Sequence, residues 1–268
     1  FETARGGILR AGLGFDECDV AIITNVGDGD HLGLNYINTV EDLAKVKRVI
    51  VDVVGEKGTA VLNATDPLVV AMAPYCQGSV LYFAIDGNHP VIRQHRAEGG
   101  RAVFVKGKTV YLAEGAHEEP VINLDRIPMT FNGRISFEVE NTIAVVGAAW
   151  AMGISRETII RQACCFATDA SKVPGRFNVM KVWGATVVVD YGHNAHSLRA
   201  MFDALATFPH KKRSALYSMA GDRRDSDIVN IGEMLGNFFD RVILYEAHTI
   251  RGRAPGMPGV AGRCTAAR

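Results

Sequence analysis

The sequence lacks any cysteine pattern typical of a metal site or a disulfide framework. It contains five cysteines, Cys18, Cys76, Cys164, Cys165 and Cys264, and none has the spacing of metal ligands. An odd number that includes an adjacent pair is also unlike a disulfide-stapled protein. We therefore expect the cysteines to behave as small hydrophobic residues in a reducing cytoplasm.

Net charge and long apolar runs are missing as well. Lys plus Arg and Asp plus Glu both number 29, so no global field favours nucleic acid or an anionic membrane. No apolar run approaches ~20 residues and no signal peptide is visible, so neither a membrane span nor secretion is expected. With 268 residues and 48% hydrophobic content, the composition is that of a globular protein with room for two domains.

The most informative stretch runs from Val20 to His31. Residues 20–23 are an apolar, β-branched run typical of a buried strand, and Thr24, Asn25 and the turn of residues 27–30 follow directly. Open α/β folds bind ligands at the carboxyl ends of their strands, so these polar groups indicate a phosphate or metal site. The alternative is an acidic, glycine-rich turn that only changes the chain direction.

Residues 39–54 predict a helix packed on the sheet. Apolar residues recur at helical spacing, and Thr39 and Asp42 are placed like a capping box. Lys45 and Lys47 lie on the polar positions, either as solvated residues or with one lysine aimed at the turn before the helix. Residues 58–67 predict a second strand that ends in polar residues.

The next segment predicts short strands and then two helices. Residues 80–84, 102–106 and 109–112 form short strand patterns between Gly or Asn turns, which we expect to be antiparallel and peripheral. Residues 141–154 and 159–166 show helical patterns. Asn141 then heads the first helix, either as a plain N-cap or as a nucleotide contact.

A second unit begins near residue 173. Strand patterns at 185–191, 214–219 and 241–245 alternate with helix patterns at 198–208 and 228–238, which predicts a parallel βαβαβ unit. The loops with sequences DYGHN and GDRRD should then lie side by side at one sheet edge. Such Asp, His, Asn and Arg groups suggest a nucleotide or phosphate site, with a salt-bridged surface turn as the alternative.

The order of these motifs resembles that of the Mur ligase family, which includes folylpolyglutamate synthetases and cyanophycin synthetases. The motifs that carry the resemblance are Thr24-Asn25-Val26 with Asp30-His31-Leu32, Leu62-Asn63-Ala64 with Asp66, Asn141, Gly175-Arg176, Asp190-Tyr191-Gly192-His193-Asn194 and Gly221-Asp222-Arg223. Residues 2–10, 26–34 and 192–194 are most similar to the cyanophycin synthetases within the family.

The resemblance implies an α/β fold of two domains and an ATP-dependent amide ligase. A central ATP-binding domain with a mainly parallel sheet, truncated at its N-terminus, would span residues 1–172, and a smaller Rossmann-like domain residues 173–252. Residues 253–268 change abruptly to Gly, Pro, Ala and Arg, which predicts a disordered tail or a shifted reading frame. In this family a carboxylate is phosphorylated by ATP and an amine displaces the phosphate.

The resemblance also implies roles for individual residues. Glu2 and His31 correspond to Mg²⁺ ligands, and Lys47 corresponds to a lysine that binds a second Mg²⁺ once it is carbamylated, with Lys45 as the rival position. Lys47, His31 and Arg176 would be catalytic. Contacts to ATP or substrate fall on Asn25, Asn141, Arg176, Asp190, His193 and Asn194.

The implied substrates are arginine and a poly-aspartate primer, with ATP and Mg²⁺ as cofactors and no nucleic acid or membrane partner; homo-oligomerisation stays open. Other Mur-type ligases of folate or cell-wall precursors, and a noncatalytic nucleotide-binding module, stay open as alternatives. The family's glycine-rich phosphate loop, G-x-x-x-x-G-K-T/S, does not occur in the sequence, and the first residue is Phe1. We therefore expect a fragment of a longer protein that is a poor ligase on its own.

Overall fold

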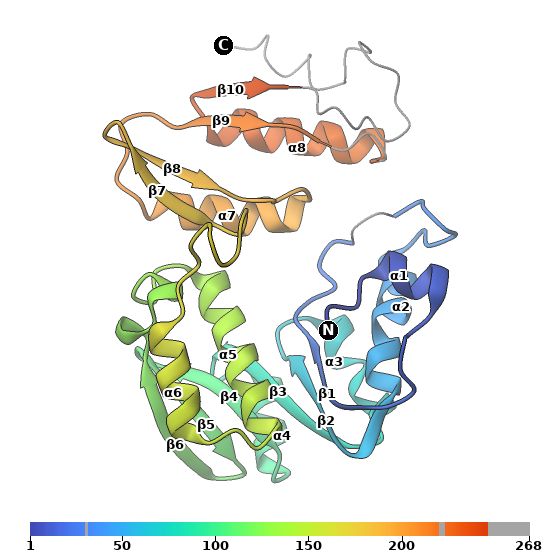
Figure 1. Ribbon diagram of the computed structural model, residues 1–268. Coiled ribbons are helices and arrows are strands. Elements are labelled where there is room, and N and C mark those ends of the chain that lie inside the picture. Colours follow the sequence, from blue (N-terminus) through green and yellow to red (C-terminus); the bar gives the residue numbers. More distant parts are fainter. Residues whose placement is uncertain (30–31, 220–222, 246–268) are drawn as a thin grey trace. The chain divides into compact units, whose positions relative to one another are not determined.

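The computed structural model describes residues 1–29, 32–219 and 223–245 (Figure 1). The prediction for residues 253–268 lies outside this range. The described chain divides into two compact units. Unit 1 contains residues 1–27 and 39–190, and unit 2 contains residues 28–38 and those from 191 onward.

Unit 1 is built on a six-stranded sheet whose spatial order follows the chain. Strands β1 to β4 pair in parallel, and β4, β5 and β6 pair antiparallel. The strands are β1 (Cys18–Ile23), β2 (Val54–Asn63), β3 (Ser79–Asp86), β4 (Arg101–Lys106), β5 (Thr109–Glu114) and β6 (His117–Asn123). The predicted α/β class with a mainly parallel sheet is confirmed.

The helices of unit 1 connect and cover these strands (Figure 1). They are α1 (Arg5–Ala11), α2 (Val40–Asp52), α3 (Pro67–Val70), α4 (Pro90–Ala97), α5 (Ser136–Ala151) and α6 (Arg156–Cys165), with short 3₁₀ turns at Ala73–Tyr75, Leu124–Arg126 and Pro128–Thr130. Helix α2 starts as predicted, because the Thr39 side chain accepts a hydrogen bond of 3.1 Å from the Asp42 amide.

Helix α5 packs closely across the parallel strands. A Cβ atom on Gly147 would stand 3.0 Å from the Leu81 side chain and 3.3 Å from that of Val61, so a larger residue here would require these side chains to shift. Leu81, Val61 and Val103 are fully buried beneath it. This contact places the first turns of α5 near the carboxyl ends of β1 and β2, where the polar residues lie.

Two predictions about this unit were wrong. Residues 80–84 are not a peripheral antiparallel strand, because β3 lies between β2 and β4, pairs in parallel with both, and is buried on both faces at its centre. Helix α5 begins at Ser136 instead of Asn141, so Ile135 occupies the N-cap position and Asn141 lies in the second turn.

A separate two-stranded sheet closes unit 1. Strands β7 (Asn178–Val182) and β8 (Ala185–Val189) form an antiparallel hairpin. Its tight turn contains Trp183 and Gly184, which have φ angles of 47° and 82°. The prediction that residues 185–191 form the first strand of a parallel unit was therefore wrong for the described residues, since β8 pairs with β7.

Unit 2 contains α7 (Ala195–Ala206), β9 (Ser214–Tyr217), α8 (Asp225–Phe238) and β10 (Arg241–Leu244). Strands β9 and β10 pair in parallel, which confirms the last strand–helix–strand step of the predicted unit. Both helices contribute to one core. Leu198 and Phe202 of α7 pack with Ile231 and Leu235 of α8, and the Phe202 and Phe238 rings stack at 4.3 Å.

The described cysteines Cys18, Cys76, Cys164 and Cys165 are free thiols, as expected. Among the described residues, no helix is both long and apolar enough to cross a membrane.

Candidate active site

Polar groups gather in unit 1 where β1 and β2 end. The Asp66 carboxylate accepts hydrogen bonds from the amides of Val26 and Gly27, at 2.7 and 3.2 Å, through one oxygen. Its other oxygen accepts from the amides of Leu68 and Val69, at 2.9 and 3.3 Å, and so caps α3. One carboxylate therefore fixes both the loop after β1 and the start of α3.

Asn63 links three elements at the same place. The side chain is 2% exposed, and its amide nitrogen donates to the Thr24 carbonyl at 2.8 Å and to the Glu140 carboxylate of α5 at 3.1 Å. Its oxygen accepts from Thr65. The sequence alone predicted no role for Asn63 or Glu140. The position of Asn63 at the end of a predicted strand, three residues before Asp66, could have indicated that Asn63 belongs to this polar group.

The structure distinguishes the two candidate lysines of α2. The Lys47 ammonium donates a hydrogen bond of 2.8 Å to the Asn25 carbonyl, at the end of β1. Lys45 instead pairs with Asp42 at 3.2 Å on the outer side of the helix, where its side chain is 69% exposed. Lys47 and Asn25 are thus brought together, and Lys45 is on the solvated face.

A second polar group of unit 1 surrounds Asn141. The Asn141 amide donates to the Glu138 carboxyl at 3.4 Å, and Glu138 is only 4% exposed. Burial raises the pKa of Glu138 to about 7, the Asn141 hydrogen bond opposes that rise, and the charge of Asp190 adds to it. Asp190, at the end of β8, accepts a hydrogen bond of 2.8 Å from the Phe177 amide.

Arg176 stands in the loop that enters β7. Asn178 organises this loop, because its buried amide nitrogen donates to the carbonyls of Val173 and Arg176 and its oxygen accepts from the Gly175 amide at 2.6 Å. The Phe177 ring packs edge-on against Phe137 of α5 at 5.3 Å. The Arg176 residue itself is exposed.

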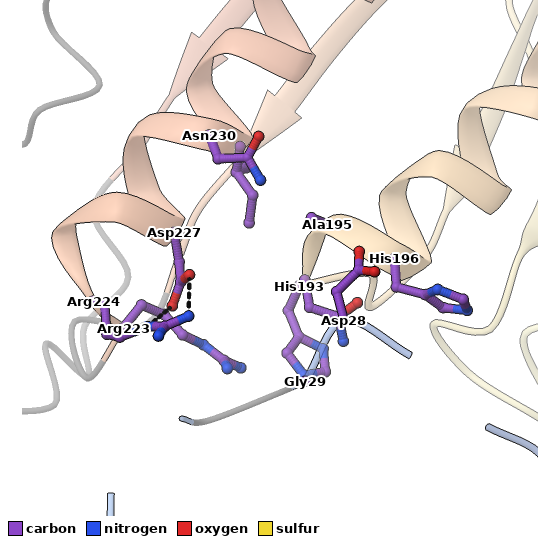
Figure 2. Close-up of a pocket in the computed structure, with 11 residues that line it drawn as sticks. Asp28, Gly29, His193, Ala195, His196, Arg223, Arg224, Asp227 and Asn230 are labelled. Carbon is purple, nitrogen blue, oxygen red and sulfur yellow. Dashed lines mark hydrogen bonds and ion pairs between the residues drawn. The ribbon is translucent and has the colours of Figure 1, made fainter. Parts of the chain in front are cut away.

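Unit 2 carries an open pocket where α7 and α8 begin (Figure 2). Its lining residues are Asp28, Gly29, His193, Asn194, Ala195, His196, Arg223, Arg224, Asp227, Asn230 and Ile231. The predicted approach of the loops DYGHN and GDRRD is confirmed for His193, Asn194, Arg223 and Arg224. Asn194 also serves as the N-cap of α7, since its side chain accepts from the Ser197 amide at 2.8 Å.

The charged side chains around this pocket differ in their partners and in their burial. Arg224 forms a two-pronged ion pair with Asp227, with both hydrogen bonds at 2.9 Å, and Asp28 pairs with Arg199. Arg223 is 8% exposed. Burial raises the pKa of Tyr217 to about 12, and the positive charge of Arg223 opposes this rise.

The structure describes only part of the predicted set of metal ligands. Glu2 is exposed just before α1, and His31 and Asp30 lie outside the described residues. Within 1–29, 32–219 and 223–245, no group of three His, Cys, Asp or Glu side chains could hold a metal ion.

Two family models match the chain. The Mur ligase middle domain matches residues 1–149, and the domain described as Mur ligase, glutamate ligase domain, matches residues 175–258. The chain belongs to the Mur ligase family.

Among curated proteins, the chain is similar to cyanophycin synthetases. It is 42% identical over 255 residues to the one from Synechocystis sp. and 38% identical to the one from Crocosphaera subtropica. Each match covers 95% of this chain but only 29% of the relative, so the chain spans less than a third of those proteins. A UDP-N-acetylmuramoyl-L-alanyl-D-glutamate–2,6-diaminopimelate ligase from Synechococcus elongatus is 27% identical over 240 residues, covering 87% of this chain and 43% of that protein.

Solved structures of Mur ligases share the fold. MurF from Acinetobacter baumannii aligns with a TM-score of 0.60 and 20% identity, covering 84% of this chain and 46% of that chain. MurF from Thermotoga maritima, solved in complex with ADP, aligns with a TM-score of 0.54 and 21% identity, covering 85% of this chain and 49% of that chain. At this identity the likeness concerns the fold alone.

Proposed function

We propose that the chain is part of an ATP-dependent amide ligase that joins arginine to the aspartate side chains of a poly-aspartate primer. The observation that carries this proposal is the 42% identity to a cyanophycin synthetase over 95% of the chain, against 27% to a cell-wall ligase. The proposed domain boundary near residue 173 agrees with the family match that starts at residue 175, whereas the compact units of the structure divide between residues 190 and 191.

The reaction would proceed in two steps. A side-chain carboxylate of the primer attacks the γ-phosphate of ATP and releases ADP, which gives an acyl phosphate. The α-amine of arginine then attacks the acyl carbon, phosphate leaves, and an amide bond forms. Both steps bring anions together, so fixed cations and oriented donors should provide most of the catalysis.

Lys47 is our candidate for one of these cations. Its ammonium lies at the carboxyl end of β1, the edge at which parallel α/β sheets bind ligands, and the Asn25 carbonyl fixes its position. Asp66 and Asn63 hold the surrounding backbone, so the ammonium stands in a preorganised setting. We assign Asn141 and Arg176 to the nucleotide and Asp190, His193 and Asn194 to nucleotide or substrate.

Mg²⁺ belongs to this proposal as the ion that would neutralise the phosphates. Glu2 and His31 are its proposed ligands. Carbamylation of Lys47 would turn its ammonium into an anionic ligand for a second Mg²⁺, a role that would replace the cationic one. Removing Mg²⁺ with a chelator should abolish phosphate release, and His31→Ala should lower the rate far more than the stability.

Two alternatives are separated by substrate. A ligase of folate or cell-wall precursors would release phosphate from ATP only with those acceptors, and a noncatalytic module would bind ATP without turnover. The test is a panel of acceptors and amino acids supplied to the full-length protein, with phosphate release and product mass as readouts. Turnover with arginine and poly-aspartate alone supports the proposal.

A further inference from the structure

Four cations are carried by adjacent segments where the two strands of unit 2 begin. Lys211, Lys212 and Arg213 belong to the loop between α7 and β9, and Arg241 is the first residue of β10. The Arg241 amide donates a hydrogen bond of 3.3 Å to the Arg213 carbonyl, and the parallel pairing of β9 with β10 continues from there. Asp240 is the only carboxylate in this loop and in the turn before β10. We call the four cations the basic patch.

The backbone of the basic patch is fixed by its neighbours. The Asp240 carboxylate accepts a hydrogen bond of 2.7 Å from the Arg213 amide, and the Asp240 amide donates to the Arg213 carbonyl at 3.0 Å. The Arg213 guanidinium lies over the Phe238 ring, 4.0 Å from its centroid. Lys211 and Lys212 directly precede this anchored residue and are exposed. The loop therefore presents both lysines to solvent from an ordered backbone.

Most of the charge of the basic patch is uncompensated. Lys211, Lys212 and Arg241 form no ion pair with a residue that the structure describes. By contrast, the exposed Lys108 of unit 1 pairs with Asp125 at 2.9 Å. The dipole of α7 does not explain the two lysines, because the helix ends several residues earlier and its field fades within the last turn. An excess of positive charge therefore remains on this surface, and it attracts anions.

The basic patch and the pocket lie at opposite ends of α7. Asn194 is the N-cap of this helix and lines the pocket, whereas the loop of the basic patch follows the C-terminal end of the helix. A helix of 12 residues is about 18 Å long. Since an extended peptide covers at most ~3.6 Å per residue, at least ~5 residues are needed to reach from one end to the other. A single ligand that contacts both places must therefore be an extended polymer.

We propose that the basic patch is a second binding site for the acidic primer, and that it holds primer carboxylates at a distance from the reacting residue. This proposal rests on the proposed function, which makes poly-aspartate the acceptor. An unmodified aspartate residue of the primer carries one negative charge at neutral pH. Lysine ammonium groups on flexible stems bind carboxylates in many geometries, so the patch can hold the polymer in any register.

Ligation changes the charge of the polymer. Each new amide bond consumes one side-chain carboxylate, and the attached arginine adds one guanidinium and one α-carboxylate. A modified residue is therefore neutral overall, whereas an unmodified residue is anionic. The basic patch should prefer primer segments that still lack arginine and should release them as they are modified.

The test compares a primer that is too short to reach the basic patch with one that is long enough. Full-length protein is assayed for phosphate release with ATP, arginine and poly-aspartate of about 3 or about 20 residues, which span at most ~11 and ~70 Å. The patch variant Lys211→Gln/Lys212→Gln removes two charges of the basic patch. The control Lys57→Gln/Lys108→Gln removes two exposed charges from unit 1. Thermal unfolding verifies that each variant is folded.

We expect the patch variant to raise the KM for the long primer by about 3- to 10-fold, because each exposed ion pair contributes little. The KM for the short primer, the KM for ATP and kcat should stay within about twofold, since the patch does not contact the reacting atoms. Salt at ~0.5 M should raise the wild-type KM for the long primer towards that of the patch variant. An unchanged KM for the long primer, equal rises for both primers, or the same rise in the control would overturn the proposal.

Binding measured without ATP separates this proposal from the proposed function. Labelled poly-aspartate is titrated with the same proteins and followed by fluorescence anisotropy, with unlabelled poly-aspartate, arginine-modified polymer and single-stranded DNA as competitors. Weaker binding by the patch variant than by the wild type and the control supports the patch even if arginine is never ligated. Equal binding by all proteins, or equally strong competition by the arginine-modified polymer and poly-aspartate, would refute it. Stronger competition by DNA than by poly-aspartate would reassign the patch to nucleic acid and overturn the proposal.

Discussion

The ammonium of Lys47 donates a hydrogen bond of 2.8 Å to the backbone carbonyl of Asn25, at the point where β1 ends. A lysine from the middle of α2 is thereby held at the carboxyl edge of the parallel strands. Lys45, two residues earlier, faces solvent and pairs with Asp42. Substitutions of Lys47 and Lys45 can therefore be compared on the same helix, with Lys45 as the control.

We expect Lys47→Ala to lower the ligation rate by about 10²- to 10³-fold, as the loss of one preorganised charge does in other enzymes. Lys45→Ala should leave the rate within about twofold, because an exposed i,i+3 pair contributes little. Steady-state phosphate release measures both. Similar rates for the two variants would remove Lys47 from the site.

Asp66 should matter for stability because its two oxygens accept from four amides. Asp66→Asn replaces one acceptor with a donor and should lower the free energy of unfolding by about 1 to 3 kcal/mol. Asp125→Asn is the control, since Asp125 forms an exposed pair with Lys108. Urea denaturation followed by circular dichroism distinguishes the two. An unchanged midpoint for Asp66→Asn would contradict this role.

Glu138 should make unit 1 sensitive to pH. Its pKa is raised to about 7 in the folded chain. Between about pH 4.5 and 7, the folded state therefore keeps a proton that the unfolded state has lost. The contribution of Glu138 to stability is therefore fully present below about pH 4.5, falls as pH rises from about 4.5 to 7, and is lost above that range, by up to ~3 kcal/mol in all.

Glu138→Gln should remove this fall and give a higher melting temperature than the wild type at pH 8. The exposed Glu157→Gln should keep the wild-type profile. Melting temperatures measured from pH 5 to 8.5 supply the comparison. Parallel profiles for the wild type and Glu138→Gln would show that Glu138 does not titrate in this range.

Much of unit 1 was predictable because local signals agreed with the fold. The apolar run of β1 and the Thr39 cap of α2 were both found at their observed places. The start of α5 was missed because residues 137–140 alternate apolar and polar types, which is typical of a strand, whereas burial against the sheet makes them helical.

Other features depended on partners that are distant in sequence. The pairing of β8 with β7 was missed, although the two-residue turn at Trp183-Gly184 is a hairpin signal. The choice between Lys45 and Lys47 and the link from Asn63 to Glu140 required the packing of whole elements. Only the family resemblance, and not composition or spacing, indicated the substrates.

The 268-residue chain alone should be a very poor ligase. Its sequence contains no glycine-rich G-x-x-x-x-G-K-T/S loop, since Gly107-Lys108-Thr109 belongs to the hairpin of β4 and β5. The backbone donors that would position the β- and γ-phosphates are therefore missing from it. Phosphate release by the chain and by the full-length protein should differ by at least ~10²-fold. Equal turnover would show that the chain carries a complete site.

Arginine incorporation by the full-length protein is the measurement that tests the account most directly. With ATP, Mg²⁺ and a poly-aspartate primer, we predict one phosphate released for each arginine added, as shown by product mass, and a loss of both signals in Lys47→Ala. Phosphate release that requires a folate or cell-wall precursor instead of arginine and poly-aspartate, or ATP binding without any turnover, would contradict the proposed function.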